Sequence, residues 1–495
     1  MPFSPPVRSW FEAAFPEPTL AQARAWPSIA AGEHTLLCAP TGSGKTLAAF
    51  LWAIDRIGSA PSREAGGTRV VYLSPLRALA VDIEKNLRSP IRGIELAAQR
   101  VGGSFVAPSV GLRTGDTSPE ERRKMAKRPP DILVTTPESL YLLLTSAARD
   151  GLASVETVIV DEIHALAPTK RGAHMAPSLE RLHTWVTAHG YPPPQRIGLS
   201  ATQRPLETVA DFLGGRDVDG AVSKPRPVRI VDAGITKELD LEVRVPVEDM
   251  ASLGTIVEEP QAGAAAAGPQ RRSIWPSMHP ALLELVEQHR STLIFVNARR
   301  MAERLSSRLN ELHDEAIALK AEATDGTTGS LQPSRSDVVA AGAESIGTSN
   351  PDGVELVKAH HGSLSRERRL MFEDELKRGT LAGLVATSSL ELGIDMGAVD
   401  LVIQVASPGS VAAGLQRIGR AGHQVGVPSR GRIFPRHRAD LLETAVVAER
   451  MHSGEIEHTK IVRNPLDVLA QQLVATVALE DVSVEGLYAL ARGTA

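Results

Sequence analysis

One glycine-rich stretch, Ala39–Thr46, constrains the fold of this chain most strongly; it reads A-P-T-G-S-G-K-T. It follows the apolar run Thr35–Cys38 and precedes apolar residues at helical spacing from Leu47 onward. A strand, a glycine loop and a helix in this order predict a phosphate-binding loop, because glycines let successive N–H groups point inward and the helix N-terminus adds partial positive charge. The alternative is an ordinary glycine turn, and Ala39 in place of the usual first glycine leaves it open.

The residue types within this stretch suit a nucleoside triphosphate and a magnesium ion. The cradle itself would be the backbone around Gly42, Ser43 and Gly44. We expect the Lys45 ammonium to reach the β- and γ-phosphates and the Thr46 hydroxyl to bind Mg²⁺.

Composition limits the class of protein. The formal net charge is −4 and the isoelectric point is about 6.4, so any nucleic-acid binding must come from local basic clusters. Cys38 is the single cysteine, which excludes an intrachain disulfide and a cysteine-rich metal site. Residues 1–18 lack the apolar run of a signal peptide, and no run approaches the roughly 18 apolar residues of a membrane helix. We therefore expect a cytoplasmic protein.

Short apolar segments alternate with helical patterns, and polar motifs follow the apolar segments. This alternation predicts α/β domains with mostly parallel sheets covered by helices, in which ligands bind beyond the carboxyl ends of the strands. The motifs in the first half are Ser74–Arg77, Arg113–Asp116, Thr135–Glu138, Asp161–His164 and Ser200–Thr202.

A second series of the same kind follows. Polar and apolar residues alternate from Leu239 to Val247, which predicts an antiparallel or edge strand. A further strand–helix series starts at Leu293. We expect flexible insertions near residues 258–273 and 321–352, which are poor in large apolar residues.

The sequence predicts helices over residues 439–451 and 465–478, followed by a third short helix or strand over 482–491. Leu466, Leu469, Leu473 and Val477 share one face of an amphipathic helix. This tail of about 55 residues is too short for a comfortable core of its own, so we expect the start of a longer domain.

Asp161 and Glu162 directly follow three β-branched residues at the end of an apolar segment. A carboxylate at that position can hold Mg²⁺ through water, and its neighbour can orient or deprotonate an attacking water. The alternative is a solvated acidic pair in a loop.

Two motifs in the second half also suit phosphate chemistry. In Gln416–His423, Arg417 and Arg420 share a face if the segment is helical, and two guanidinium groups can neutralise charge on transferring phosphoryl oxygens. The segment Ala386–Asp395 ends in hydroxyl residues, glycine and aspartate, which could contact a phosphate and a ribose. The alternatives are a basic loop that binds any anion and a plain helix cap.

Three local basic clusters stand out despite the acidic balance: Arg122–Lys124 with Lys127–Arg128, then Arg366, Arg368 and Arg369, then Arg430 through Arg438. We interpret the first as a solvated face, as most charge runs are. His360–His361 lacks neighbouring residues at metal-ligand spacing, so Mg²⁺ is the metal that the sequence supports.

Taken together, the motifs resemble those of the superfamily-2 helicases, in which Ala39 in place of glycine is normal. The matching set, in order, is Gln22, A-P-T-G-S-G-K-T, S-P-L-R-A-L, T-T-P-E-S-L, D-E-I-H, S-A-T, the strand before Asn297, A-T-S-S-L-E-L-G-I-D and Q-R-I-G-R-A-G-H. The phrase D-E-I-H, the segment from His360 to Glu367 and the final His423 are most similar to the Lhr (large helicase-related) group.

The resemblance implies two RecA-like domains, at 1–225 and 226–437, with ATP in the cleft between them. Residues 438–495 would begin a winged-helix-like domain that is truncated in this chain. Gln22 would read adenine, Gly393 and Asp395 would lie near the nucleotide, and Arg417 and Arg420 would contact the γ-phosphate.

The resemblance also implies roles in coupling and grip. Ser200 and Thr202 would couple hydrolysis to domain movement. The strand would be held, mostly by its backbone, through Arg77, Thr136, Asn297 and Thr387.

The activity implied is that of an ATP-driven 3′-to-5′ DNA translocase in the cytoplasm, associated with the nucleoid and linked to DNA repair. Its partners would be single-stranded DNA and the duplexes or RNA:DNA hybrids that it unwinds. An RNA helicase and a non-catalytic nucleic-acid-binding fragment are the alternatives, because backbone contacts do not distinguish the sugar reliably.

Overall fold

The computed structural model describes the whole chain except residues 41, 61–65, 202, 221, 235–237, 254–272, 326–354, 392–398 and 423–427, and at 321–325 and 366 it describes the backbone alone. The described residues separate into two compact units. The first contains residues 1–236 and 456–495, and the second contains described residues between 237 and 455.

The first unit is built on a seven-stranded sheet in the order β3-β4-β2-β5-β6-β1-β9, in which every ladder is parallel. Its strands are short, and the central ones are mostly apolar and buried, as expected for a parallel sheet covered on both faces. They are β1 (Thr35–Cys38), β2 (Val70–Leu73), β3 (Val110–Arg113), β4 (Ile132–Thr135), β5 (Thr157–Val160), β6 (Gln195–Ser200) and β9 (Arg229–Asp232).

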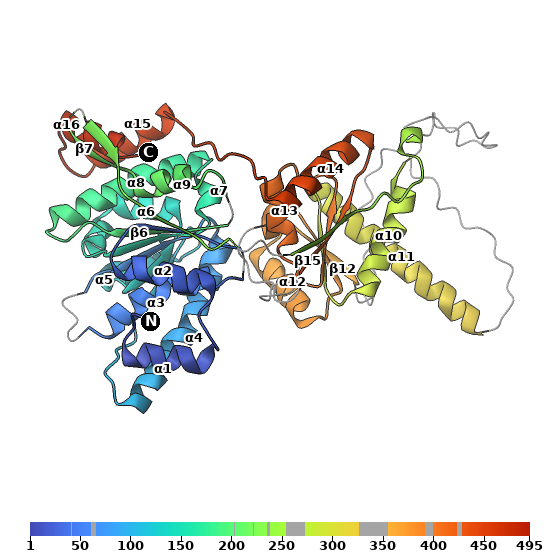
Figure 1. Cartoon of the computed structure of the whole chain (residues 1–495), viewed down its shortest axis with the longest axis horizontal. Helices are drawn as coiled ribbons and strands as arrows, with labels where there is room; N and C mark the ends of the chain where they lie inside the picture. Colours follow the sequence, from blue (N-terminus) through green and yellow to red (C-terminus); the bar gives the residue numbers. More distant parts are fainter. Residues whose placement is uncertain are drawn as a thin grey trace. The chain divides into compact units, whose positions relative to one another are not determined.

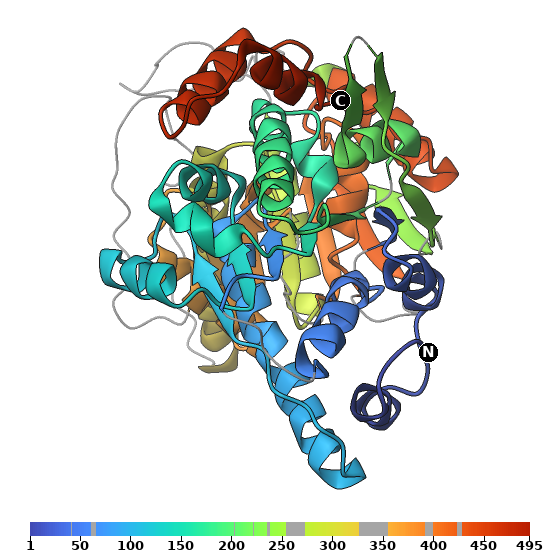
Figure 2. The same ribbon diagram turned by 90° about the vertical axis from the view of Figure 1, so that its left-hand side faces the viewer.

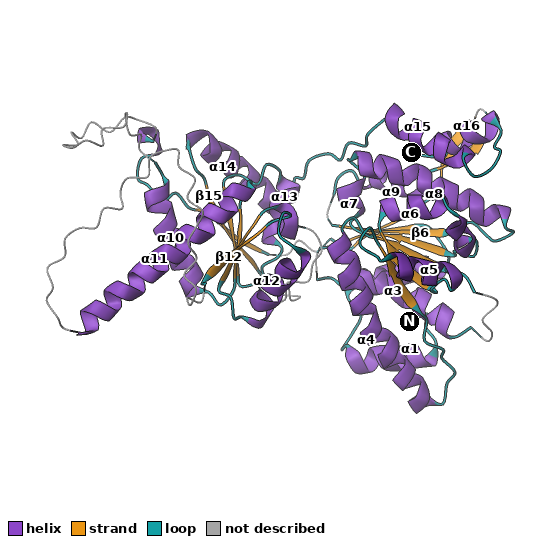
Figure 3. Ribbon diagram, turned by 180° about the vertical axis from the view of Figure 1, so that it is seen from behind, coloured by secondary structure: helices purple, strands orange, loops and turns teal. Residues whose placement is uncertain are grey.

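Helices cover both faces of this sheet (Figures 1 and 3). Because strand residues alternate between faces, Leu37 and Tyr72 join the core cluster on one side, and Leu36 and Val71 join the cluster on the other. The first cluster packs against α1 (Pro5–Ala14), α2 (Leu20–Ala30), α3 (Lys45–Gly58) and α4 (Arg77–Val101). The second packs against α6 (Pro137–Leu144), α7 (Ile163–Leu166), α8 (Lys170–Ala188) and α9 (Leu206–Gly214).

Smaller elements complete this part of the unit. They are α5 (Pro119–Lys127), the 3₁₀ helix η1 (Ala147–Leu152) and the antiparallel pair β7 (Arg216–Asp219) and β8 (Val222–Pro225). Among the described residues, no helix is long and apolar enough to cross a membrane.

The second unit repeats the architecture with a six-stranded parallel sheet in the order β10-β15-β14-β11-β13-β12. The expected pair of parallel-sheet α/β domains is therefore confirmed. The strands are β10 (Leu239–Val243), β11 (Thr292–Phe295), β12 (Val357–His360), β13 (Gly383–Ala386), β14 (Leu401–Val405) and β15 (Ser429–Phe434). The helices are η2 (Met250–Ser252), α10 (Trp275–Gln288), α11 (Arg299–Asp325), α12 (Arg366–Arg378), η3 (Ser388–Leu390), α13 (Val411–Ile418) and α14 (Arg438–Ser453).

The structure refines two expectations for this unit. The alternating segment forms the edge strand β10, but it ends at Val243 and runs parallel to β15 rather than antiparallel. The backbone of α11 continues to Asp325, four residues beyond the predicted start of the insertion at 321. The rest of that insertion, and the insertion near 258–273 apart from Ser273, lie outside the described residues.

The tail divides between the two units. Helix α14 packs against α13 in the second unit, whereas α15 (Leu466–Val477) and α16 (Val484–Arg492) pack against α8 in the first (Figure 2). The apolar face predicted for α15 is only partly covered: Leu469 and Leu473 are half-buried, whereas Leu466 and Val477 are exposed. The buried side instead carries Gln472, whose amide nitrogen donates to the His174 carbonyl (2.9 Å) and to Ser178 Oγ (3.0 Å).

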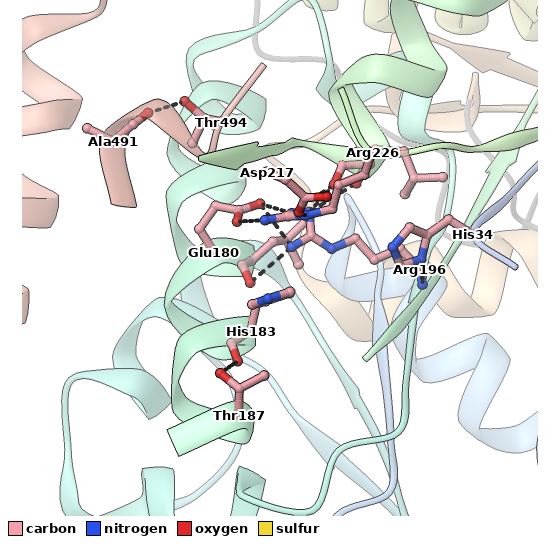
Figure 4. A network of polar contacts seen from close by, with 12 residues as sticks. His34, Glu180, His183, Thr187, Arg196, Asp217, Arg226, Ala491 and Thr494 are labelled. Atoms are coloured by element: carbon pink, nitrogen blue, oxygen red, sulfur yellow. Dashed lines mark hydrogen bonds and ion pairs between the residues drawn. The ribbon is translucent and has the colours of Figure 1, made fainter. Parts of the chain in front are cut away.

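A buried ionic network joins α8 to β6 and to the residue that follows β8 (Figure 4). The Glu180 carboxylate lies 2.9 Å from Nη2 of Arg196 and accepts from Nη1 (2.9 Å) and Nη2 (2.8 Å) of Arg226. Asp217, which is largely exposed, accepts from Nε of Arg226. Burial and the nearby charges of Arg196 and Arg226 lower the pKa of His34 to about 4.

Candidate nucleotide and strand sites

The glycine loop begins where β1 ends and closes at the N-terminus of α3. Gly42 (φ 80°) and Gly44 (φ 77°) adopt left-handed backbone conformations, which glycine reaches without strain. The Lys45 ammonium donates to the carbonyls of Ala39 (2.5 Å) and Pro40 (2.9 Å), so its charge lies inside the loop. Thr46 is the second residue of α3 and is half-buried.

Residues at the start of α2 fasten the loop from the side. Thr19 and Gln22 form a capping box, and the Thr19 hydroxyl also donates to the Ser43 carbonyl (2.7 Å). The Gln22 amide nitrogen lies 3.4 Å from the Gly44 carbonyl, and a methyl group on Gly44 would come within 2.5 Å of it. Gln22 is therefore placed against the loop, and its contact with adenine stays a prediction. We did not predict Thr19, although the T-x-x-Q spacing of a capping box was readable.

The acidic pair lies at the carboxyl end of β5, and both residues are buried. The Asp161 carboxylate accepts hydrogen bonds from the Tyr72 hydroxyl and from the Glu162 N–H (2.9 Å). Burial, followed by the charge of Glu162, raises the pKa of Asp161 above its ordinary value. A Mg²⁺ ion fits this arrangement, because it prefers oxygen ligands and would neutralise the negative charge that burial makes costly.

Glu162 itself has a left-handed backbone (φ 45°), which is uncommon for a residue other than glycine. Such a conformation persists where the surrounding structure holds it, and it is frequent at functional sites. Here it marks the point where the chain turns from β5 into α7.

His164 connects the acidic pair to the end of β6. Its Nδ1 accepts from the Ala201 N–H (3.1 Å) and lies 3.4 Å from the Ser200 hydroxyl. Burial lowers the pKa of His164, so the ring is neutral and carries its proton on Nε2, 3.4 Å from Oε2 of Glu162. The His164 ring therefore lies between Ser200 and Glu162. Thr202 lies outside the described residues.

We had not assigned His164 a role in the site. The signal available was its position two residues after Glu162, at the end of a buried strand.

Two predicted strand-binding residues of the first unit lie at the carboxyl ends of neighbouring strands, β2 and β4. Arg77 begins α4, is 62% exposed and donates through Nη1 to Asp116 (2.6 Å). Thr136 is buried and caps α6 through its hydroxyl, which accepts from the Ser139 N–H (3.4 Å). Arg77 can therefore reach a strand with its side chain, and Thr136 is placed to shape the loop.

In the second unit, Arg417 and Arg420 do not share a helical face. Helix α13 ends at Ile418, and Arg420 lies in the turn beyond it. Glu391 holds both instead: its carboxylate accepts from Nε (3.1 Å) and Nη2 (2.9 Å) of Arg417, and its carbonyl accepts from Nη2 of Arg420 (2.8 Å).

Arg417 has further partners in the interior of the unit. Its Nη1 donates to Oε1 of Gln404 (3.0 Å) and to Oδ1 of Asn297 (3.3 Å). The Asn297 amide nitrogen donates to the Ser407 carbonyl (2.9 Å). These contacts favour a structural role for Arg417 in holding these segments together. Its catalytic role stays a prediction.

The remaining predicted residues are placed as follows. Thr387 is half-buried and immediately precedes η3, while Gly393 and Asp395 lie outside the described residues. We had not predicted roles for Glu391 and Gln404. A polar residue inside the otherwise apolar strand β14 was the readable signal for Gln404.

Three family models match consecutive parts of the chain. Residues 19–212 match the DEAD/DEAH box helicase, and residues 352–424 match the helicase conserved C-terminal domain. Residues 449–495 match the winged helix domain of the large helicase-related protein.

Whole-chain comparisons agree with these matches. The chain is 51% identical over 495 residues to the Lhr helicase/probable uracil glycosylase of Mycolicibacterium smegmatis and 47% identical over 508 residues to the Lhr helicase/uracil glycosylase of Escherichia coli. It is covered completely in both comparisons, but it spans 30% and 31% of the length of these relatives.

A solved structure, described as Mycobacterium smegmatis helicase Lhr bound to ssDNA and AMP-PNP, is also similar. It matches with a TM-score of 0.81 and 50% identity, covering 99% of this chain and 55% of that one. The sequence, the two parallel-sheet units and the winged-helix match together show that this chain belongs to the Lhr group of superfamily-2 helicases.

Proposed function

We propose that this chain is an ATP-dependent helicase motor that moves 3′ to 5′ along single-stranded DNA and unwinds duplexes or RNA:DNA hybrids. The observation that carries the proposal is the contact series from Asp161 through Glu162 and His164 to Ser200, with the Lys45 charge close enough to act on Asp161. It joins a phosphate cradle to an acidic pair and to the end of a neighbouring strand. A similar protein whose structure is described with ssDNA and AMP-PNP supports DNA as the strand.

In the first unit, each residue has a distinct part. The glycine loop would hold the phosphates, with Lys45 turning from the carbonyls of Ala39 and Pro40 to the β- and γ-phosphates. Thr46 and Asp161 would bind Mg²⁺, which when bound neutralises phosphate charge and aligns the oxygens for transfer. Glu162 would orient the attacking water and accept its proton, since its carboxylate is buried and held near the His164 proton.

The second unit would contribute positive charge. Arg420 would neutralise the developing charge on the γ-phosphate when the nucleotide draws the units together, and Glu391 would keep that guanidinium in place. Gly393 and Asp395 would line the nucleotide in the same state.

Motion along the strand would follow from alternating grip. His164 and Ser200, with Thr202, would report the state of the γ-phosphate from Glu162 to the rest of the first unit. Residues at the strand ends of both sheets would hold the phosphate backbone: Arg77, Thr136, Asn297 and Thr387. A role in DNA repair, in the cytoplasm with the nucleoid, follows from the proposed substrate.

A variant of the proposed general base tests the proposal. Glu162→Gln should retain ATP binding and lose strand-stimulated hydrolysis by at least about a hundredfold, since general base catalysis contributes about that much or more. Glu156→Gln, just before the opposite end of β5, is the matched control and should hydrolyse normally. Normal turnover by Glu162→Gln would refute its role.

The same assay separates the alternatives. ATPase of residues 1–495 should rise with single-stranded DNA more than with single-stranded RNA of the same sequence. Clear preference for RNA would favour an RNA helicase. Binding without any stimulated ATPase would favour a non-catalytic platform.

A further inference from the structure

Helix α5 (Pro119–Lys127) contributes no buried residue to the first unit. It is held at its start by a capping box in which Ser118 Oγ accepts from the Glu121 N–H and the Glu121 carboxylate accepts from the Ser118 N–H (3.1 Å). Its contact with the core is limited to the partly buried Met125, so most of its charged residues face away from the core.

Three cations share one side of this segment, at spacings of three and four residues: Lys124, Lys127 and Arg128, hereafter the α5 cationic face. All three are exposed, and in the part of the chain that the structure describes none of them forms an ion pair. Like charges at this spacing repel one another. The arrangement therefore opposes helix formation, which favours an external anion as its partner.

Two exposed arginines of α4 are neutralised. On α4, Arg88 pairs with Glu84 and Arg92 pairs with Glu95. On α5 the available acids are Glu120 and Glu121, and the Glu121 carboxylate already accepts from the N–H and the hydroxyl of Ser118. Five cations and two acids lie between residues 119 and 128, so the α5 cationic face belongs to a segment of net positive charge on a chain whose net charge is −4.

The start of α5 is fastened to the turn that holds Arg77. Nη2 of Arg122 donates to the carbonyls of Thr114 (3.2 Å) and Gly115 (2.9 Å). Asp116, the next residue, binds Nη1 of Arg77, and a methyl group on Gly115 would lie 2.6 Å from Nη2 of Arg77. The Arg77 guanidinium therefore rests on the turn from which α5 departs.

We propose that the α5 cationic face binds the phosphate backbone of the nucleic acid and extends the strand path beyond Arg77. This rests on the proposed function, in which Arg77 grips the strand. Arg77 and Arg122 both contact the turn at 114–117, so the α5 cationic face belongs to a helix that adjoins the Arg77 site. The contact is to phosphate and reads no sequence.

The test is the salt dependence of binding by the full chain. The triple variant Lys124→Gln, Lys127→Gln, Arg128→Gln is compared with wild type by fluorescence anisotropy of a labelled single strand between 50 and 200 mM NaCl. For a single strand, removal of one phosphate contact lowers the slope of log K against log salt by about 0.7, so removal of three should lower it by about 2. At 0.1 M salt, binding should weaken by tenfold or more.

A matched control removes the same charge elsewhere on the unit. It carries Arg88→Gln, Arg92→Gln and Arg100→Gln on α4 and should keep the wild-type slope. Strand-free ATPase and thermal melting of the α5 variant should equal wild type, because its three residues contribute nothing to the core or the nucleotide site. A fully paired duplex of the same sequence, run in parallel, shows whether the phosphates belong to the single strand or to the duplex.

An unchanged slope in the α5 variant, or an equal decrease in the α4 control, overturns the inference while wild-type binding upholds the proposed function. A decrease seen with the duplex alone overturns the single-strand path. A wild-type chain that binds neither nucleic acid overturns the proposed function and this inference with it.

Discussion

Removing the charge of Glu180 should destabilise the first unit severely. Glu180, Arg196 and Arg226 have side chains that are 5%, 3% and 9% exposed, and one carboxylate neutralises two guanidinium groups. In Glu180→Gln the shape of the side chain is kept, but two buried cations lose their principal counter-ion. Breaking a buried pair in this way costs about 3–5 kcal/mol, because it leaves uncompensated charge in the interior.

The expected loss converts to a large shift in melting temperature. For domains of roughly this size, 1 kcal/mol corresponds to about 2–4 °C, so a loss near 4 kcal/mol predicts a decrease of about 8–16 °C. Tryptophan fluorescence reports this unit selectively, because four of the five tryptophans lie in it: Trp10, Trp26, Trp52 and Trp185.

Asp217→Asn is the matched control. Asp217 also pairs with Arg226, but its side chain is 73% exposed, so its loss should cost less than about 1 kcal/mol. A Glu180→Gln melting temperature within 3 °C of that of Asp217→Asn would refute the reasoning, since burial would then not decide the energy of this network.

Three further predictions follow from single groups. Burial raises the pKa of Cys38 to about 12, so its alkylation by iodoacetamide at pH 8 should be about a thousandfold slower in the folded chain than after denaturation; similar rates would contradict this. His34, with its pKa lowered to about 4, stays neutral when folded, whereas the unfolded chain binds a proton below about pH 6.5. The free energy of unfolding should therefore fall by about 2 kcal/mol between pH 6.5 and 4, and urea titrations of His34→Gln should lack this part of the decrease. Glu391→Gln should slow stimulated ATPase at least about tenfold with ATP affinity unchanged, because Arg417 loses the carboxylate that pairs with it; a wild-type rate would contradict this.

Local sequence was enough to predict much of the first unit. A strand end, a glycine loop and a helix start are encoded within a dozen residues, so the placement of Lys45 at the start of α3 followed from spacing alone. The same holds for Asp161 and Glu162. A short β-branched run predicts a buried strand, and the residues that follow it lie at the carboxyl ends of the parallel strands, where ligands bind.

Contacts between distant segments were beyond such reasoning. The spacing of Arg417 and Arg420 suggested a shared helical face, but α13 ends between them and the backbone and side chain of Glu391 bring them together. In α15 the apolar pattern identified one face of the helix, but it did not show that the helix packs against α8. The buried side carries Val468 and Ala475 together with Gln472, which bonds to α8, and a polarity pattern does not predict such a polar contact.

Helix α2, which contacts the glycine loop, also carries the fluorescent residue Trp26. Gln22 and Trp26 lie four residues apart on that helix, so the indole lies one turn from the side chain that contacts the loop. Trp26 is packed edge-on against Phe3 (4.8 Å) and Phe11 (5.4 Å), away from water. Nucleotide binding that shifts the loop should therefore change the emission of Trp26, which lies more than a dozen residues before the first phosphate-binding glycine.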